Sequence, residues 1–218
     1  MSKPTDNLDV IADEIRKVFA VRDAAREKVL PLSRETIHYC SITIRAVHRQ
    51  EFAQAAELLK TAASLLNQAK QATQDFEELI NAGYLRDAEK EYAEASTLVA
   101  MVGGLTLPGP VDLHIDPASY LNGLGEAVGE LRRYLLDSIR HGDLSRGEEL
   151  LSAMDDIYGV LVTMDFPDAI TGGLRRTTDN MRGVLEKTRS DFTLVLEQKN
   201  LEKKLEKFEG KAEGIQNS

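Results

Sequence analysis

Hydrophobic residues recur every three to four positions along almost the whole chain, and no segment alternates with a period of two. This spacing predicts helices throughout and no β-sheet. Asp6 or Asn7 is expected to cap the first helix, because short polar side chains accept hydrogen bonds from the free amides of a first turn. The apolar positions of that helix include Val10, Ile11, Ile15, Val18 and Phe19.

Prolines and glycines indicate where the predicted helices end. Pro31 predicts a kink or a short break, since proline removes a backbone donor. Residues 103–110 form the clearest loop, and Asp116-Pro117 predicts a helix start with an acidic cap and a proline in the first turn. Further helices are expected over about 32–49, 51–69, 85–102, 116–141, 145–164, and from 169 or 174 to 209, with a weak continuation over 74–81. The chain is therefore predicted to be an all-α bundle of about seven helices.

Composition narrows the class of protein. The chain has 218 residues, of which 42% are hydrophobic and 29% charged, as in ordinary soluble globular proteins. No apolar run is long enough for a membrane span, and no signal region begins the chain. Cys40 is the single cysteine, so an intrachain disulfide and a cysteine-rich zinc site are excluded. We therefore expect a cytoplasmic protein, and its net charge of -9 still permits a local basic patch for nucleic acid.

Glu91 and Glu94 stand three residues apart on a helix that otherwise reads as buried. Ionised carboxylates at the margin of a core face are costly unless a cation compensates them. Mg²⁺ or Mn²⁺ takes oxygen ligands, and such an ion would make this helix part of a phosphodiester-cleaving site. From the spacing alone, the favoured interpretation is an ordinary helix whose glutamates lean into water, because carboxylates of this kind are usually exposed.

Basic residues near the N-terminus form rows at a spacing of four, such as Arg22 with Arg26 and Arg45 with Arg49. Rows of this kind suit phosphate contacts. Acidic residues are interleaved with them, so a solvated and balanced helix face is the alternative. The candidate nucleic-acid-binding residues are Arg22, Arg26, Arg34, Arg45, His48 and Arg49.

Three glycines, Gly123, Gly125 and Gly129, surround Glu126 within a predicted helix. Each costs close to 1 kcal/mol relative to alanine there. Close approach of another helix or a ligand would justify them. No nucleophile elbow, phosphate-binding glycine loop or His-Glu-x-x-His pattern is present in the sequence.

Several segments together resemble the translin family. Residues 129–143, from Gly-Glu-Leu to His-Gly-Asp, resemble its Gly/Ser-Glu-Leu…Asn-Ser-Val…Gly-Asp segment. Glu91-Tyr-Ala-Glu-Ala resembles the Glu-Tyr-Val-Glu-Ala segment of translin-associated factor X, the catalytic branch. Residues 32–34 and 44–49 are similar to the family's N-terminal basic helices, and the resemblance spans roughly residues 10 to 200. The chain thus combines features of translin and of translin-associated factor X. In this it is similar to the archaeal homologues of the catalytic subunit of the component 3 promoter of the RNA-silencing complex.

The resemblance implies a single translin-type domain over residues 1–210 and assembly into a hollow barrel, here a homo-octamer. Residues 211–218 are expected to form a disordered tail, as chain termini often do. The barrel would enclose short RNA or single-stranded nucleic acid, which a Mg²⁺- or Mn²⁺-dependent endoribonuclease site would cleave. Glu91, Glu94 and Glu149 would hold the metal by this resemblance. Ser145 stands where the catalytic branch has an aspartate, and we choose Glu126 as the replacement, with Asp143 as an alternative and Glu130 as a structural residue.

Two other functions remain open at this point. One is a non-catalytic oligonucleotide-binding barrel like translin, which Ser145 would indicate. The other is a helical scaffold unrelated to nucleic acid. Self-association is expected, because apolar positions extend along a last helix that is too long for one small bundle to cover. We expect these positions to be buried against neighbouring subunits. These positions are Leu194, Leu201, Leu205 and Phe208.

Overall fold

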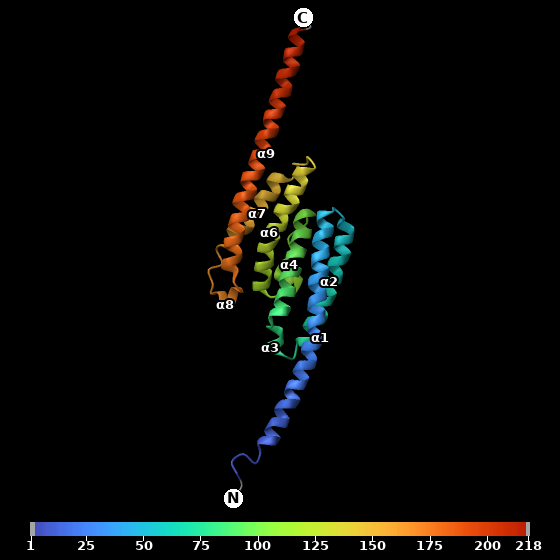
Figure 1. Cartoon of the computed structure of the whole chain (residues 1–218), viewed down its shortest axis with the longest axis vertical. Coiled ribbons are helices and arrows are strands. Elements are labelled where there is room, and N and C mark those ends of the chain that lie inside the picture. Colours follow the sequence, from blue (N-terminus) through green and yellow to red (C-terminus); the bar gives the residue numbers. More distant parts are fainter. Residues whose placement is uncertain (1–2, 217–218) are drawn as a thin grey trace. The chain divides into compact units, whose positions relative to one another are not determined.

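The computed structural model describes residues 3–216, with side chains described except at 77 and from 210 onward, and every element in that range is a helix. Six of these helices are long, and three are short helices of four residues each. Figure 1 shows them along the chain. The predicted all-α class is confirmed. No helix in this range is long and apolar enough to cross a membrane. The helices are α1 (Leu8–His48), α2 (Phe52–Thr73), α3 (Glu77–Ile80), α4 (Gly83–Val102), α5 (Pro110–Leu113), α6 (Pro117–Arg140), α7 (Gly147–Leu161), α8 (Asp168–Thr171) and α9 (Leu174–Gln216).

Pro31 lies inside α1 and does not end it, so a break at this position is wrong and the two helices predicted around it are one. Proline removes one backbone hydrogen bond. Val29 and Ser33 on either side of it are buried, and the packing of that face supports the helix through the gap. This merger explains why six long helices are found where about seven were expected.

The first of two compact units spans Met1–Leu124. In it α1, α2 and α4 pack side by side (Figure 1). Small side chains at the contacts allow the helix axes to approach closely. Ala46, Ala55, Ala62 and Ala88 are all fully buried.

The second unit spans Gly125–Ser218 and contains most of α6 with α7, α8 and α9. Helix α7 packs on α9. A Cβ atom at Gly147 would lie 2.1 Å from the ring of Phe192, so this glycine lets α7 meet the aromatic side chain. Arg132 on α6 donates to Asp191 (2.7 Å) and Thr188 (3.1 Å) on α9, which ties these two helices together.

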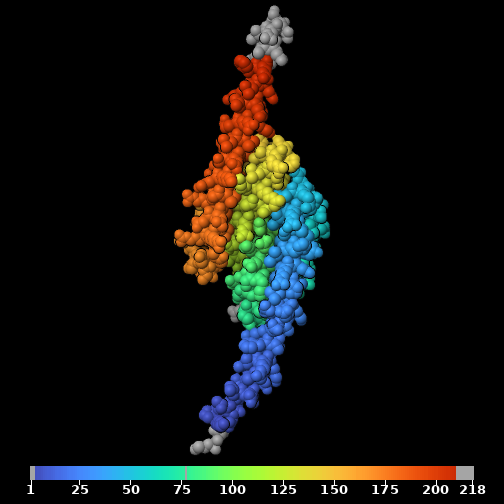
Figure 2. Space-filling model, viewed as in Figure 1, coloured from blue at the N-terminus to red at the C-terminus, as the bar shows by residue number. Residues whose placement is uncertain are grey.

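One end of a long helix projects from each unit (Figure 2). The apolar positions predicted for the first helix lie on such an end, and their exposed fractions are between 42% and 61%. On α9 the four apolar residues Leu194, Leu201, Leu205 and Phe208 are 53% to 72% exposed, so the unit does not cover them, and their burial against a neighbouring copy stays a prediction. Helix α9 continues to Gln216, past the predicted end at Glu209, and so overlaps the predicted tail; residues 217–218 lie outside the described part.

Candidate metal centre

Helix α4 carries Glu91 and Glu94 through the middle of the first unit. Alanines at 88, 93, 95 and 100 are buried and favour the helical conformation. Because α4 is covered on several sides, Glu94 is only 8% exposed, and Glu91 is half-buried. The prediction of an ordinary helix whose glutamates lean into water therefore does not fit Glu94.

Helix α6 approaches α4 closely at Gly123. A Cβ atom there would lie 2.3 Å from the carbonyl oxygen of Lys90 and 2.7 Å from the Cβ of Ala93. A side chain at this position would therefore push the helices apart. The helix-to-helix contact anticipated from the glycines is thus found at Gly123, beside the Glu91–Glu94 pair.

Glu126 lies one turn further along α6 from Gly123. Both residues belong to the continuous helix α6. One carboxylate oxygen from each of Glu91, Glu94 and Glu126 lies within 4.8 Å of the others. We call these three residues the acidic site.

The chemistry of the acidic site matches a hard divalent cation. Three carboxylates this close repel one another unless something positive joins them. Carboxylate oxygens are the ligands that Mg²⁺ and Mn²⁺ prefer. In the second unit, Glu126 also lines a cavity of about 130 Å³ with Gly129, Thr177 and Asn180. A hollow of that size has room for water, which Mg²⁺ usually retains among its ligands.

The negative charges of Glu91 and Glu94 affect Cys40, a residue of α1. Burial, and after it the charges of Glu91 and Glu94, raises the pKa of the Cys40 thiol. Cys40 is fully buried. It therefore remains protonated at neutral pH, and a role as a reactive thiolate is excluded.

Glu149, the third predicted metal ligand, belongs to the second unit. Its carboxylate accepts two hydrogen bonds from the Arg146 guanidinium, at 2.6 and 3.0 Å. These hydrogen bonds lower the pKa of Glu149. Glu149 is outside the group of three carboxylates found among the described residues, and its role as a ligand stays a prediction.

The residues around Ser145 form a turn. Asp143 accepts a hydrogen bond from the backbone amide of Ser145 at 2.9 Å. Hydrogen bonds from the Ser145 amide and hydroxyl lower the pKa of Asp143. Asp143 therefore caps the turn before α7. Glu130, predicted to be structural, forms an ion pair with Arg133 at 3.7 Å.

The predicted nucleic-acid-binding residues all lie on α1 or just after it. Arg22 pairs with Glu78 (2.7 Å), Arg26 with Glu27 (2.8 Å) and Arg49 with Glu51 (2.7 Å). These three cations are partly neutralised. Of their partners, Glu27 is one of the interleaved acidic residues, whereas Glu78 comes from α3 and Glu51 follows α1. Arg34 and Arg45 are exposed and His48 is half-buried.

Sequence reasoning missed an ion pair between the half-buried Lys70 on α2 and the buried Glu89 on α4, whose atoms lie 2.6 Å apart. Glu89 is 5% exposed. A signal for it exists in the sequence, because Glu89 is spaced four residues from both Leu85 and Ala93 on the buried stripe of α4.

Known proteins resemble the chain over most of its length, although no family model matches it. The protein MJ0175 of Methanocaldococcus jannaschii is 30% identical over 210 residues, which are 93% of this chain and 91% of that protein. The crystal structure of AfC3PO is 35% identical with a TM-score of 0.77, covering 84% of this chain and 96% of that one. The structure of AfC3PO in complex with duplex RNA is also 35% identical, with a TM-score of 0.76 over 84% and 95% of the two chains. Apo-NeC3PO, at 18% identity and a TM-score of 0.74 over 89% and 100% of the chains, shares the fold.

Proposed function

The chain belongs to the translin family, close to the C3PO proteins, and from that premise we propose that it is a metal-dependent endoribonuclease acting on short RNA. The acidic site is the observation that carries this proposal, since three carboxylate oxygens within 4.8 Å of one another suit a divalent ion. That AfC3PO has been solved with duplex RNA supports RNA as the substrate.

In this proposal Glu91, Glu94 and Glu126 hold a Mg²⁺ or Mn²⁺ ion. Such an ion supplies Lewis acidity, polarising a phosphate oxygen and acidifying water. Glu94 is buried and fixed, so it provides a ligand in one orientation, while Glu91 and Glu126 are half-buried and leave a side open to substrate. Arg34 and Arg45, on the exposed face of α1, would hold the RNA backbone as point contacts to phosphate, together with Arg22, Arg26, His48 and Arg49.

The assembly we propose is a homo-octameric, hollow barrel. The projecting apolar ends of α1 and α9 support self-association, because exposed apolar stripes of this length are typical of interaction surfaces. Enclosure would limit the substrate to RNA short enough to enter.

Cleavage of a short labelled RNA with Mg²⁺, with Mn²⁺ and with EDTA tests the function. Wild-type protein is expected to cleave with either ion and to stop in EDTA. Glu91→Gln, Glu94→Gln and Glu126→Gln should each reduce cleavage by more than the roughly 10- to 100-fold that loss of an outer-shell partner costs. Glu57→Gln, in an exposed pair on α2, is the matched control and should cleave like wild type. Undiminished cleavage by all three site variants would refute the assignment.

Glu149→Gln separates two roles for that residue. If Glu149 moves from Arg146 to the metal, the variant loses cleavage as the other three do. If it serves only as the partner of Arg146, cleavage is retained.

A non-catalytic RNA-binding protein is the second candidate. Ser145, which lacks a carboxylate, and the engagement of Glu149 by Arg146 favour it. In that case RNA binds with the same affinity in Mg²⁺ and EDTA, and no condition gives cleavage.

A further inference from the structure

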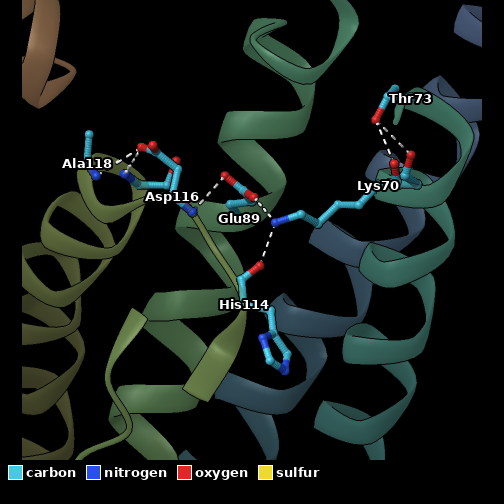
Figure 3. A network of polar contacts seen from close by, with 8 residues as sticks. Lys70, Thr73, Glu89, His114, Asp116 and Ala118 are labelled. Atoms are coloured by element: carbon cyan, nitrogen blue, oxygen red, sulfur yellow. Dashed lines mark hydrogen bonds and ion pairs between the residues drawn. The ribbon is translucent and has the colours of Figure 1, made fainter. Parts of the chain in front are cut away.

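A polar network connects α2, α4 and the start of α6 within the first unit (Figure 3). The Lys70 ammonium pairs with Glu89 Oε1 at 2.6 Å and also donates a short hydrogen bond to the backbone carbonyl of His114. The other Glu89 oxygen accepts from the backbone amide of Asp116 at 3.4 Å. One buried carboxylate therefore joins a lysine from α2 to the segment that leads into α6.

Asp116 immediately precedes α6. Its carboxylate accepts hydrogen bonds from the backbone amides of Ala118 (2.9 Å) and Ser119 (3.2 Å), which caps the helix. Glu89 thus holds the cap of α6, and Gly123 touches α4 two turns later. Two contacts separated by about 10 Å along one helix fix both its shift and its rotation relative to α4.

Stability alone is a weak reason for this pair. Removing Glu89 fully and Lys70 in part from water costs free energy that offsets much of their attraction, and apolar residues of similar volume often replace buried ion pairs without loss of stability. What apolar residues do not reproduce is direction, since only Glu89 and Lys70 point specific atoms at the Asp116 amide and the His114 carbonyl. Lys70 also neutralises Glu89, which would otherwise add a further negative charge two residues before Glu91.

We infer that Lys70 and Glu89 are positioning residues of the acidic site. They hold the start of α6 against α4 and thereby place Glu126 beside Glu91 and Glu94. This inference rests on the proposed function in one respect, namely that the acidic site binds a divalent cation.

Mn²⁺ binding, measured from the electron paramagnetic resonance of free Mn²⁺ in a titration of the full chain, tests it. In Glu89→Gln the amide oxygen still accepts from Asp116 but the ion pair is lost, and the dissociation constant for Mn²⁺ is expected to rise at least about tenfold. The decisive variant is Lys70→Met combined with Glu89→Leu. It restores an apolar contact, so its melting temperature without metal should match wild type, while its Mn²⁺ affinity should remain at least about tenfold lower.

Lys70→Arg keeps the charge and a donor, and should bind Mn²⁺ within about twofold of wild type. Lys60→Met with Glu57→Leu removes an exposed pair on α2 and is the matched control, with no expected change in affinity. Should the double apolar variant fail to fold, Glu89→Gln is compared with Lys70→Met, which leaves a charge of the opposite sign. Loss of Mn²⁺ affinity in both supports positioning, and loss in Glu89→Gln alone overturns it.

The outcomes are distinguishable. If wild type binds Mn²⁺, Glu94→Gln abolishes binding and both Glu89 variants bind like wild type, the positioning role is overturned and the metal site stands. If wild type does not bind Mn²⁺, or Glu91→Gln and Glu94→Gln bind it unchanged, the metal site fails and the positioning role fails with it.

Discussion

Two buried residues show how burial acts at the acidic site: Glu94, which belongs to it, and Cys40, whose thiol is affected by its charges. A buried carboxylate is tolerated when it is hydrogen-bonded, paired or bound to metal. A buried thiol next to two glutamates keeps its proton instead.

Cys40 predicts how stability depends on pH. Burial and the neighbouring glutamates raise its pKa in the folded protein, whereas an unfolded chain releases the thiol proton above about pH 8.5. The folded state then binds more protons than the unfolded state, so the stabilising contribution is complete below pH 8.5 and is lost as pH rises above it, at up to about 1.4 kcal/mol per pH unit. Urea unfolding of wild type and Cys40→Ala between pH 7 and 9.5 measures this. An equally steep decline in both proteins would contradict the assignment to Cys40.

Gly123 predicts the cost of separating α4 from α6. Gly123→Ala places a methyl group where the Lys90 carbonyl oxygen would lie 2.3 Å away, and overpacking of this kind destabilises by about 1–3 kcal/mol. Gly159→Ala on α7 is the matched control, because a Cβ there has nothing within 4 Å and should stabilise by about 0.4–1 kcal/mol. Denaturant unfolding gives both values. A Gly123→Ala protein as stable as wild type would show that the two helices separate freely.

Among the helices, α1 has two different halves that share one face. Leu8, Ile11, Ile15 and Val18 are spaced three and four residues apart and are exposed, and the same register continues to Ala25 and Val29, which are buried. The face that enters the core of the first unit therefore extends beyond it. A long apolar seam left open in this way is typical of helices that pack against another copy.

Disrupting that seam should reduce the size of the assembly. Ile15→Glu together with Val18→Glu places charges in a surface that we expect to be covered, so light scattering at micromolar concentration should give a smaller mass than wild type, with unchanged helical content by circular dichroism. Lys17→Glu changes charge on the same turns outside the seam and should leave the mass unchanged. Equal masses for all three proteins would place the interface elsewhere, with the exposed apolar residues of α9 as the next surface to test.

For the whole molecule, the net charge of -9 means that RNA must find a local basic surface. Arg34 and Arg45 are the exposed cations of the predicted set for which no ion pair is described within residues 3–216. They should therefore carry more of the phosphate contacts than Arg22, Arg26 or Arg49, whose charges are partly compensated.

RNA binding at several salt concentrations tests this distribution. Each phosphate contact contributes about 0.7 to 0.9 to the slope of log affinity against log salt, so Arg34→Ala with Arg45→Ala should flatten the slope by roughly 1.4 to 1.8 per bound subunit. Lys60→Ala, an exposed residue on α2, should leave the slope unchanged. An unchanged slope in the double arginine variant would remove these residues from the RNA-binding surface.

Much of the helical architecture was predictable because its signals are local. Asp116 does cap α6, which begins at Pro117, and the glycines and prolines of 103–110 do lie between α4 and α6. Pro31 misled because the gap it opens in α1 is supported by burial of Val29 and Ser33, which is a tertiary effect. The exposure of the first turns of α1 was likewise hidden, since an apolar stripe has the same spacing whether a core or a neighbouring copy covers it.

By itself the sequence determined that the chain is helical, roughly where its helices begin and end, and that Glu91 and Glu94 share one side of a buried helix. Tertiary structure brought an oxygen of Glu126, which the resemblance had suggested, within 4.8 Å of theirs. It alone decided that Glu149 pairs with Arg146 and that Lys70 and Glu89 connect three helices at the start of α6. The reason is physical. Helical periodicity and capping act over a few neighbouring residues, whereas the meeting of carboxylates depends on how closely whole helices pack, which at Gly123 depends on the absence of a single Cβ atom.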